Sequence, residues 1–170
     1  MMRNMFNDQP VLRGTVEIRE AVVADAQAMS VILLEIIEAT GRPRSSSPSY
    51  VLSTYIQNPS GVRCSVAVNE TGEVIGFQSL IRAVPGNPYG VAEGWGIIGT
   101  HISPRAHRKG VGAMLFRASR GAAVAAALPR IDATIEGGNE GALRYYEAIG
   151  FRTYREGSGK IHKAFDTGIG

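Results

Sequence analysis

The chain has 170 residues, a length that suits one domain with a full hydrophobic core. Hydrophobic residues make up 44% and charged residues 19%, with a net charge of +3, which is ordinary for a globular protein and lacks the dense basic stripe of a nucleic-acid binder. No apolar run reaches the ~20 residues that a transmembrane helix needs, so a membrane partner is not expected either.

The single cysteine, Cys64, excludes a disulfide framework within the chain, and residues 1–10 lack the apolar core of a secretory signal. We therefore expect a cytoplasmic protein. Residues 1–14 mix polar side chains without a clear pattern, so this segment is expected to be poorly ordered and residues 15–170 are expected to form the domain.

A strand and an amphipathic helix are predicted first. Residues 16–19 alternate apolar and polar side chains, as in a half-buried strand. Asp25 can cap the helix that follows, and Gly41 stands where a glycine commonly ends a helix. The apolar face of this helix consists of Met29, Ile32, Leu33 and Ile36.

A loop, a short helix and a hairpin are predicted next. Residues 42–49 are polar and predict a loop, and the short helix is expected over residues 50–57. Alternating segments over residues 64–68 and 74–80 flank a turn, which predicts a β-hairpin.

Residues 95–102 predict a further strand, in which Gly96 and Gly99 mark a bulge or a close backbone approach. A long helix follows, with an apolar face made of Val111, Met114, Leu115, Ala118, Ala122 and Ala125.

The last third of the chain predicts a strand over residues 131–135 and a helix over residues 142–149 that Gly150 closes. Residues 151–155 and 161–165 can pair as terminal strands. The elements together predict one α/β domain with a mixed sheet, in which a hairpin precedes a strand–helix–strand–helix unit.

Residues 101–115 join the end of a strand to the start of a helix through a basic turn. The first N–H groups of a helix lack partners within it and lie at the positive end of its dipole, so they favour an anion. Gly110 and Gly112 would let a phosphate approach the backbone closely. The basic side chains of the turn are Arg105, Arg108 and Lys109. A helix start with glycines for tight packing is the alternative interpretation.

Taken with residues 139–151, this turn resembles the GCN5-related N-acetyltransferase (GNAT) superfamily. The family's phosphate loop reads Arg/Gln-x-x-Gly-x-Gly/Ala, and here His107, Gly110 and Gly112 stand in that register. Its C-terminal signature reads Asn-x-x-Ala-x-x-x-Tyr-Glu-x-x-Gly-Phe, and is matched by Asn139, Ala142, Tyr146, Glu147, Gly150 and Phe151. His107 departs from the usual Arg or Gln and Arg108 from a frequent Gly. Contacts there are largely with the backbone, so phosphate binding is still expected.

The resemblance implies an α/β fold with a twisted mixed sheet of about six or seven strands, splayed in the middle and flanked by about four helices. Acetyl-CoA would lie in the splay, with its pantetheine arm along the strand over residues 95–102. The residues implied to contact it are Thr100, Ile102, His107, Arg108, Lys109, Gly110, Val111, Gly112, Ala113 and Asn139. For Asn139, a helix cap is an equal alternative. No metal is expected, because the histidines are dispersed and Cys64 has no partner cysteine.

Tyr146 resembles the family's general acid, which protonates the thiolate of CoA after an amine attacks the acetyl carbonyl. A thiol pKa near ~8.5 and a phenol pKa near ~10 make this proton transfer feasible. The alternative is a core tyrosine, an interpretation that suits Tyr145 better.

The general base stays open. Glu93 lies just before the strand over residues 95–102, and Glu136 just after its expected partner, but each is also typical of a solvated carboxylate at a strand end. His101 titrates in a suitable range and is a further candidate.

The resemblance implies an N-acetyltransferase that acts on a primary amine by direct attack in a ternary complex. A faint likeness to phosphinothricin acetyltransferases favours a small amine or amino acid, and Arg42 and Arg44 could recognise its carboxylate or phosphate. A protein lysine or N-terminal acetyltransferase and a non-catalytic acyl-CoA sensor are the alternatives. The oligomeric state stays open, with a homodimer among the options.

Overall fold

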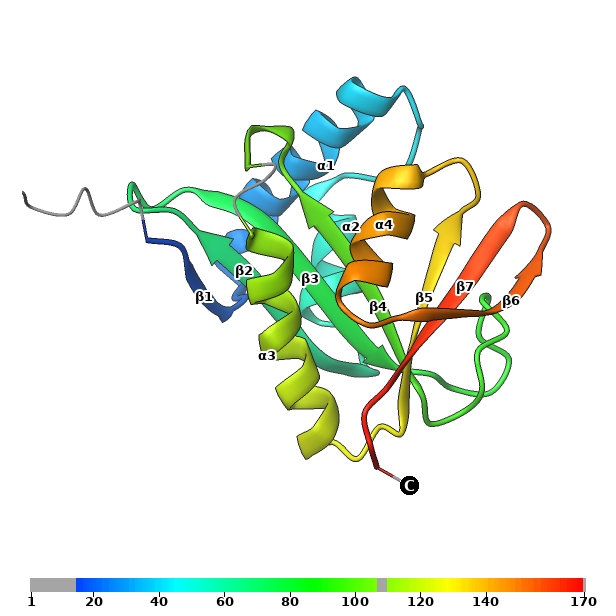
Figure 1. The fold of residues 1–170 in the computed structure, drawn as a ribbon. Coiled ribbons are helices and arrows are strands. Elements are labelled where there is room, and N and C mark those ends of the chain that lie inside the picture. Colours follow the sequence, from blue (N-terminus) through cyan, green and yellow to red (C-terminus); the bar gives the residue numbers. More distant parts are fainter. Residues whose placement is uncertain (1–14, 107–109, 170) are drawn as a thin grey trace, which may run out of the picture.

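A seven-stranded mixed sheet forms the centre of the protein, as seen in a computed structural model that describes residues 15–106 and 110–169 (Figure 1). Its strands are β1 (Glu17–Glu20), β2 (Gly61–Val68), β3 (Val74–Arg82), β4 (Gly96–Ile102), β5 (Arg130–Glu136), β6 (Arg152–Gly157) and β7 (Lys160–Asp166). The spatial order is β1-β2-β3-β4-β5-β7-β6, so the last strand of the chain lies between the two that precede it. Only β4 and β5 run parallel.

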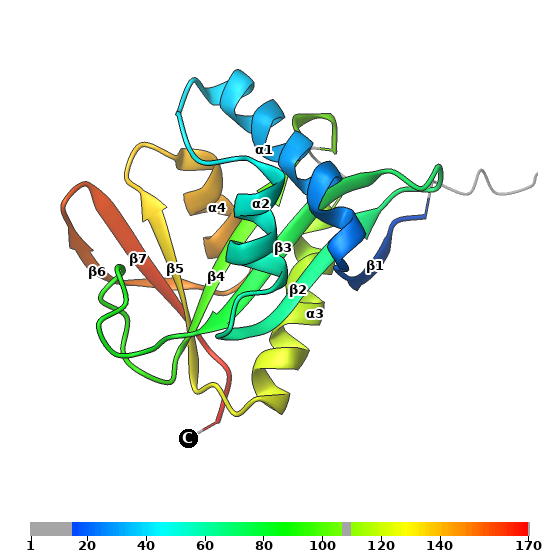
Figure 2. The ribbon, with the colours of Figure 1, turned by 180° about the vertical axis from the view of Figure 1, so that it is seen from behind.

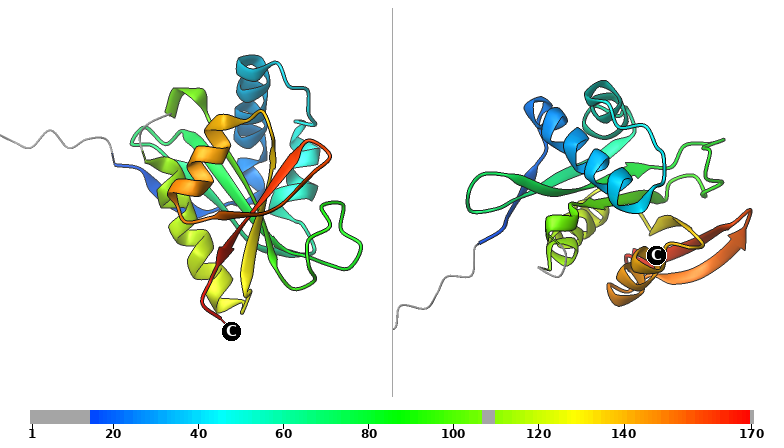
Figure 3. Two further views of the ribbon diagram at one scale, coloured as in Figure 1. Left: turned by 45° about the vertical axis from the view of Figure 1, so that its right-hand side comes forward. Right: turned by 90° about the horizontal axis from the view of Figure 1, so that it is seen from above.

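Helices cover both faces of this sheet. They are α1 (Ala26–Thr40), α2 (Pro48–Val51), α3 (Val111–Ala125) and α4 (Glu140–Ala148), with the short turns η1 (Val23–Asp25), η2 (Leu52–Ile56) and η3 (Pro104–Ala106). Helices α1 and α2 lie on one face (Figure 2), and α3 and α4 lie on the opposite face (Figure 3). Within the described ranges, no helix combines the length and apolar character needed to span a bilayer.

Helix α1 forms as its apolar spacing predicts. Met29, Ile32 and Leu33 are at most 1% exposed and pack in a core cluster with Phe77 of β3. Gly41 ends the helix with a φ of 69°, a left-handed conformation that a glycine adopts without a Cβ penalty.

The side chain of Asp25 does not cap α1, which corrects the sequence-based expectation. Its carboxylate instead accepts hydrogen bonds from both terminal nitrogens of Arg19, at 2.8 and 2.9 Å, and from the N–H of Val22 at 2.8 Å. A guanidinium that engages both oxygens is a stronger partner than one helix N–H group. The Arg19 hydrogen bond holds the pKa of Asp25 below its usual value.

The second helical segment begins before the predicted residue 50. Ser47 caps α2, accepting from the N–H of Tyr50 at 3.2 Å, and Pro48 occupies the first turn, where its missing N–H costs nothing. The segment then continues as the single π-helical turn η2.

Strands β4 and β5 separate soon after they begin. They pair at Gly96–Ile131 and Ile97–Asp132, whereas β4 pairs with β3 along all seven of its residues. The predicted splay is therefore present, but the predicted bulge in β4 is wrong, because its register with β3 has no shift. Close packing explains Gly96 instead: a Cβ there would lie 2.8 Å from Cδ1 of Leu80.

Candidate active site

A cavity of about 610 Å³ lies between the start of α3, helix α4 and the C-terminal end of α1. It is lined by the residues predicted to contact a cofactor that fall within the described ranges: Thr100, Ile102, Gly110, Val111, Gly112, Ala113 and Asn139. Tyr146 lines the same cavity. The structure thus brings residues 110–113 at the start of α3 together with Asn139, Ala142 and Tyr146, although they lie far apart in sequence. His107, Arg108 and Lys109, predicted to contact the cofactor as well, lie outside the described residues.

The start of α3 has the features of an anion-binding helix end. Gly110 precedes the helix with a φ of 71°, a conformation that favours glycine. The N–H of Met114 is bonded to the carbonyl of Gly110 at 3.2 Å, so Val111, Gly112 and Ala113 supply the N–H groups of the first turn, which lack helical acceptors. These donors and the helix dipole lie at the cavity wall and suit a phosphate.

Gly112 has a structural reason that differs from the predicted one. A Cβ at this position would lie 2.5 Å from Cε2 of Tyr145, so close packing against the ring of Tyr145 requires a glycine here. The hydroxyl of Tyr145 also donates to the carbonyl oxygen of Gly112 at 2.7 Å. Gly112 therefore allows α3 and α4 to pack closely together.

Tyr146 presents its hydroxyl to Thr100 of β4 inside the cavity. Its OH and Oγ of Thr100 are 2.8 Å apart, and Tyr146 is 6% exposed. Burial raises the pKa of Tyr146 above its usual value, so its phenol stays protonated at neutral pH. A protonated hydroxyl beside the helix end is suited to proton donation.

Two polar residues that the sequence interpretation missed support this pair. Gln78 of β3 and Ser119 of α3 are fully buried, and Oγ of Ser119 donates to Oε1 of Gln78 at 2.6 Å. Nε2 of Gln78 donates to Oγ of Thr100 at 2.9 Å and to the hydroxyl of Tyr145 at 3.1 Å. The one signal in the sequence is a glutamine that interrupts the apolar residues of β3.

Asn139 serves as the cap of α4. Its Oδ1 accepts from the N–H of Ala142 at 3.1 Å, as one of the two interpretations predicts. Asn139 also lines the 610 Å³ cavity. Its role as a helix cap is compatible with contact to a cofactor, which stays a prediction.

A second cavity, of about 510 Å³, lies on the face that carries α1 and α2. Its lining includes Arg44, Tyr55 and His101, together with Thr134 of β5. Among the residues that the structure describes, no Asp or Glu lines either this cavity or the 610 Å³ one. The second cavity is consequently positive in character and suits an anionic group on a ligand.

Arg44 fixes the protonation of His101. Nη1 of Arg44 lies 3.2 Å from Nδ1 of His101, and Nη2 donates to the hydroxyl of Tyr55 at 2.7 Å. Because a guanidinium only donates, Nδ1 must accept and the ring proton sits on Nε2. Burial and then the charge of Arg44 lower the pKa of His101 to about 3. His101 is therefore a neutral side chain with an N–H to offer at Nε2, which makes it a poor base.

The two predicted carboxylate bases lie apart from Tyr146. Glu93 is exposed on the loop before β4 and lines neither of these cavities. Glu136 forms an ion pair with Lys160 at 2.5 Å, which lowers its pKa. Glu136 lines a further cavity, of about 620 Å³, that shares Arg44 with the second cavity and Asn139 with the first.

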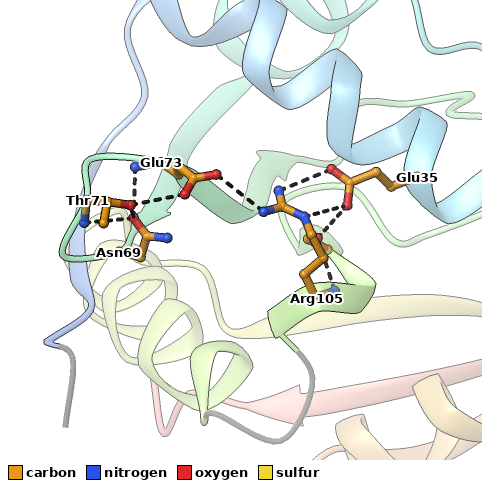
Figure 4. Close-up of polar contacts among 6 residues, drawn as sticks. Glu35, Asn69, Thr71, Glu73 and Arg105 are labelled. Carbon is orange, nitrogen blue, oxygen red and sulfur yellow. Dashed lines mark hydrogen bonds and ion pairs between the residues drawn. The ribbon is translucent and has the colours of Figure 1, made fainter.

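Arg105 is a structural anchor rather than a free cation of the phosphate loop. It bonds Glu35 of α1 through Nε and Nη2, both at 3.2 Å, and Glu73 through Nη1 at 3.3 Å (Figure 4). Oγ of Ser103 donates to the same Glu35 carboxylate at 2.6 Å. Ser103 and Arg105, directly after β4, are therefore held to α1 and to the β2–β3 turn.

The described ranges contain no group of three or more His, Cys, Asp or Glu side chains arranged to hold a metal. The chemistry of the cavities is instead that of hydroxyls, helix N–H groups and guanidinium groups.

A sequence model of the acetyltransferase (GNAT) family matches residues 31–151. No curated protein sequence matches the chain. Among solved structures, YncA from Salmonella typhimurium, determined with acetyl-CoA, is 20% identical with a TM-score of 0.71, over 89% of this chain and 94% of that one. A phosphinothricin acetyltransferase from Sinorhizobium meliloti, also with acetyl-CoA, is 21% identical with a TM-score of 0.70, over 89% and 88%. The GNAT domain of S. lividans PAT is 18% identical with a TM-score of 0.73, over 90% and 91%.

Proposed function

The chain belongs to the acetyltransferase (GNAT) family, and on this premise we propose that it transfers the acetyl group of acetyl-CoA to the primary amine of a small molecule or amino acid. One observation carries the proposal: the protonated hydroxyl of Tyr146 shares a cavity with the open N–H groups at the start of α3. A diphosphate binder and a proton donor are the two parts that this transfer needs.

The donor would bind in the 610 Å³ cavity. Its pyrophosphate accepts hydrogen bonds from the N–H groups of Val111, Gly112 and Ala113, and the helix dipole favours its charge. Its pantetheine arm runs along β4 beyond Ile97, where β5 no longer pairs. YncA and the Sinorhizobium meliloti enzyme, both solved with acetyl-CoA, support this choice of donor.

The reaction would proceed by direct attack. The lone pair of the amine nitrogen forms a bond to the acetyl carbonyl carbon, the C–S bond breaks, and its electron pair goes to sulfur. Tyr146 gives its proton to that sulfur, so CoA leaves as a thiol. The nitrogen loses its extra proton to water, and a water proton restores the Tyr146 phenol. Water takes this role because no Asp or Glu among the described residues lines the 610 Å³ or the 510 Å³ cavity, and Glu136, which lines the adjoining 620 Å³ cavity, is paired with Lys160.

The acceptor would bind in the 510 Å³ cavity beside α2 and reach the donor through the splay. Arg44 and the Nε2–H group of His101 suit a carboxylate on the acceptor, which favours an amino acid over a simple alkylamine. The likeness to phosphinothricin acetyltransferases points the same way.

Replacing Tyr146 with Phe tests the proposal. We expect kcat for CoA thiol release with a panel of amino acids and small amines to fall about 100-fold, the usual contribution of a general acid, while acetyl-CoA binding by calorimetry is retained. Tyr154→Phe is the control, because Tyr154 lines neither the 610 Å³ nor the 510 Å³ cavity; it removes a hydrogen bond to the buried Asp132, so its fold is checked by thermal unfolding.

Three other outcomes would count against parts of the proposal. Unchanged turnover of Tyr146→Phe would remove Tyr146 from the chemistry. Tight binding of acetyl-CoA by the wild type without thiol release from any amine would indicate a non-catalytic sensor. Turnover confined to peptide N-termini or lysines would indicate a protein acetyltransferase.

A further inference from the structure

The loop between β3 and β4, residues 83–95, forms one wall of the 510 Å³ cavity and lies beside β6 (Figure 2). At its base, the N–H of Ala83 donates to the carbonyl of Trp95 at 2.7 Å, and the N–H of Gly94 donates to the carbonyl of Ala83 at 3.0 Å. The loop is thus closed like the end of a hairpin. Its residues at the cavity wall are Ala83, Val84, Asn87, Pro88 and Tyr89.

The side chain of Asn87 fixes the shape of the loop tip, residues 87–90. Its Nδ2 donates to the carbonyl oxygens of Val84 at 2.9 Å and Val91 at 2.8 Å. Its Oδ1 accepts from the N–H groups of Tyr89 at 3.2 Å and Val91 at 3.1 Å. All four partners are backbone groups that can only donate or only accept, so the orientation of this amide is determined. A tip tied in this way loses little further freedom when a ligand packs on it.

Arg155 of β6 holds the tip from outside the loop. Its Nη2 donates to the carbonyl oxygen of Tyr89 at 2.8 Å and lies 3.3 Å from that of Gly90. The same nitrogen lies 3.3 Å from Nδ1 of His162 on β7. Within the described part of the chain, Arg155 is the one residue outside the loop that makes a hydrogen bond to residues 84–93. The tip is therefore tied to strands on the other side of the splay.

The tip also separates two cavities. Pro88 and Tyr89 line both the 510 Å³ cavity and a neighbouring one of about 410 Å³, and so does Thr134 of β5. Of these two cavities, Arg155 lines the 410 Å³ one, so it lies on the far side of the tip from the 510 Å³ space. Without the hydrogen bonds from Arg155, the tip could move and the two spaces would join.

We propose that Arg155 is a positioning residue for acceptor specificity, which holds Pro88 and Tyr89 as a fixed outer wall and so limits the size of the amine that the site accepts. The proposal rests on the transfer reaction inferred above and on acceptor binding in the 510 Å³ cavity. Arg155 acts through Tyr89 and not on the reacting atoms. An amine too large for the cavity must push the tip away and break a hydrogen bond from a charged donor, a cost that small amines do not meet.

Arg155→Gln tests the proposal with acetyl-CoA and a panel of amino acids from alanine to tryptophan. We expect kcat/KM for the largest acceptor that the wild type turns over to rise about five-fold relative to that for the smallest, the scale of one exposed hydrogen bond from a charged group. For the smallest acceptor, kcat should change less than about two-fold, as should KM for acetyl-CoA, because Arg155 lines neither main cavity. Arg152→Gln is the matched control: Arg152 is exposed on the same strand and also donates to backbone carbonyls, those of Glu147 and Phe151.

Two glycines of the loop give a second matched pair. Gly86 and Gly90 have φ values of 72° and 64°, so alanine is strained in a similar way at both. A Cβ at Gly90 would lie 3.1 Å from Nη1 of Arg155, whereas a Cβ at Gly86 would meet nothing within 4 Å. Gly90→Ala should therefore displace Arg155 and raise the same ratio of kcat/KM values, and Gly86→Ala should leave the ratio unchanged. Equal effects of the two variants would overturn the proposal.

Failure of the transfer reaction itself would look different, because the wild type would then release no thiol from any amine. Amide hydrogen exchange followed by NMR still tests Arg155 in that case. We expect the amides of Tyr89 and Gly90 to exchange about five-fold faster in Arg155→Gln than in the wild type or in Arg152→Gln. Unchanged exchange at the tip, or an unchanged ratio of acceptors in Arg155→Gln, would overturn the proposal.

Discussion

At the scale of single residues, the absence of a side chain at Gly112 positions Tyr145. The ring of Tyr145 occupies the place of a Cβ, and its hydroxyl links Gly112 to Gln78. The same contact therefore joins helix packing to the hydrogen bonds that lead to Tyr146. The sequence predicts Gly112 as a phosphate-binding residue, and in the structure the same glycine also makes room for the ring of Tyr145.

We expect Gly112→Ala to lower the free energy of unfolding by about 1–3 kcal/mol, because the new Cβ forces the Tyr145 ring to move. Urea unfolding measures this effect. Gly121→Ala in the same helix is the matched control: its Cβ meets open space, so we expect a gain of about 0.5–1 kcal/mol. Equal shifts in the two variants would refute the role of Tyr145.

The site residues divide by how locally their roles arise. Gly110 and Asn139 act on their own helix starts, so their spacing in the sequence predicts their place. Gln78 and Ser119 act across β3 and α3, and no local pattern reports a partner 41 positions away. Arg44, which contacts Nδ1 of His101 and makes it a poor base, is likewise distant from His101 in the sequence.

At the scale of elements, the end of β4 is anchored to two other elements through Arg105. Arg105 binds Glu35 on α1 and Glu73 on the β2–β3 turn, so two separate elements fix the approach to the helix that would bind pyrophosphate (Figure 4). The side chain of Arg105 is half exposed, so its ion pairs add little to global stability. Its effect is expected on the geometry of the cavity.

We expect Arg105→Gln to raise KM for acetyl-CoA by up to about five-fold, the equivalent of ~1 kcal/mol, because the approach to α3 is held less firmly. Its kcat should stay near that of the wild type, since Tyr146 is not touched. Arg144→Gln, which removes an exposed ion pair with Glu140 on α4, serves as the control. A loss of kcat without a rise in KM would contradict this role.

The order of elements along the chain was largely predictable, and their order in space was not. Apolar spacing and terminal glycines locate α1, the β2–β3 hairpin and α3. The insertion of β7 between β5 and β6 follows from backbone pairing between segments far apart, which side-chain alternation does not encode. The π-helical turn η2 and the Arg19–Asp25 pair are local, but apolar spacing indicates neither the hydrogen-bond pattern within a turn nor which polar partner a side chain takes.

At the scale of the whole molecule, His101 couples stability to pH. The unfolded chain binds a proton at this histidine below about pH 6.5, the usual histidine pKa, whereas burial and Arg44 lower the folded-state pKa to about 3. Between these values the unfolded state holds more protons, so stability falls as the pH falls. The lowered pKa values of Asp25 and Glu35 act in the same direction at more acidic pH.

We expect His101→Gln to reduce the loss of unfolding free energy between pH 7.5 and 5.0 by on the order of 1–2 kcal/mol, because glutamine takes up no proton. Urea unfolding at the two pH values gives this difference directly. A wild type and variant that lose equal stability would show that His101 is protonated in the folded protein.

Because β4 and β5 pair over only two registered positions, the sheet consists of two parts joined at one end. Strands β1 to β4 form one part and β5 to β7 the other. The two registered pairs at Gly96 and Ile97 join them. Leu80, Leu128 and Ile131 from the two parts and their connection pack in one core cluster at this junction. A ligand that enters beyond Ile97 therefore meets both parts of the sheet without displacing either of the two registered pairs.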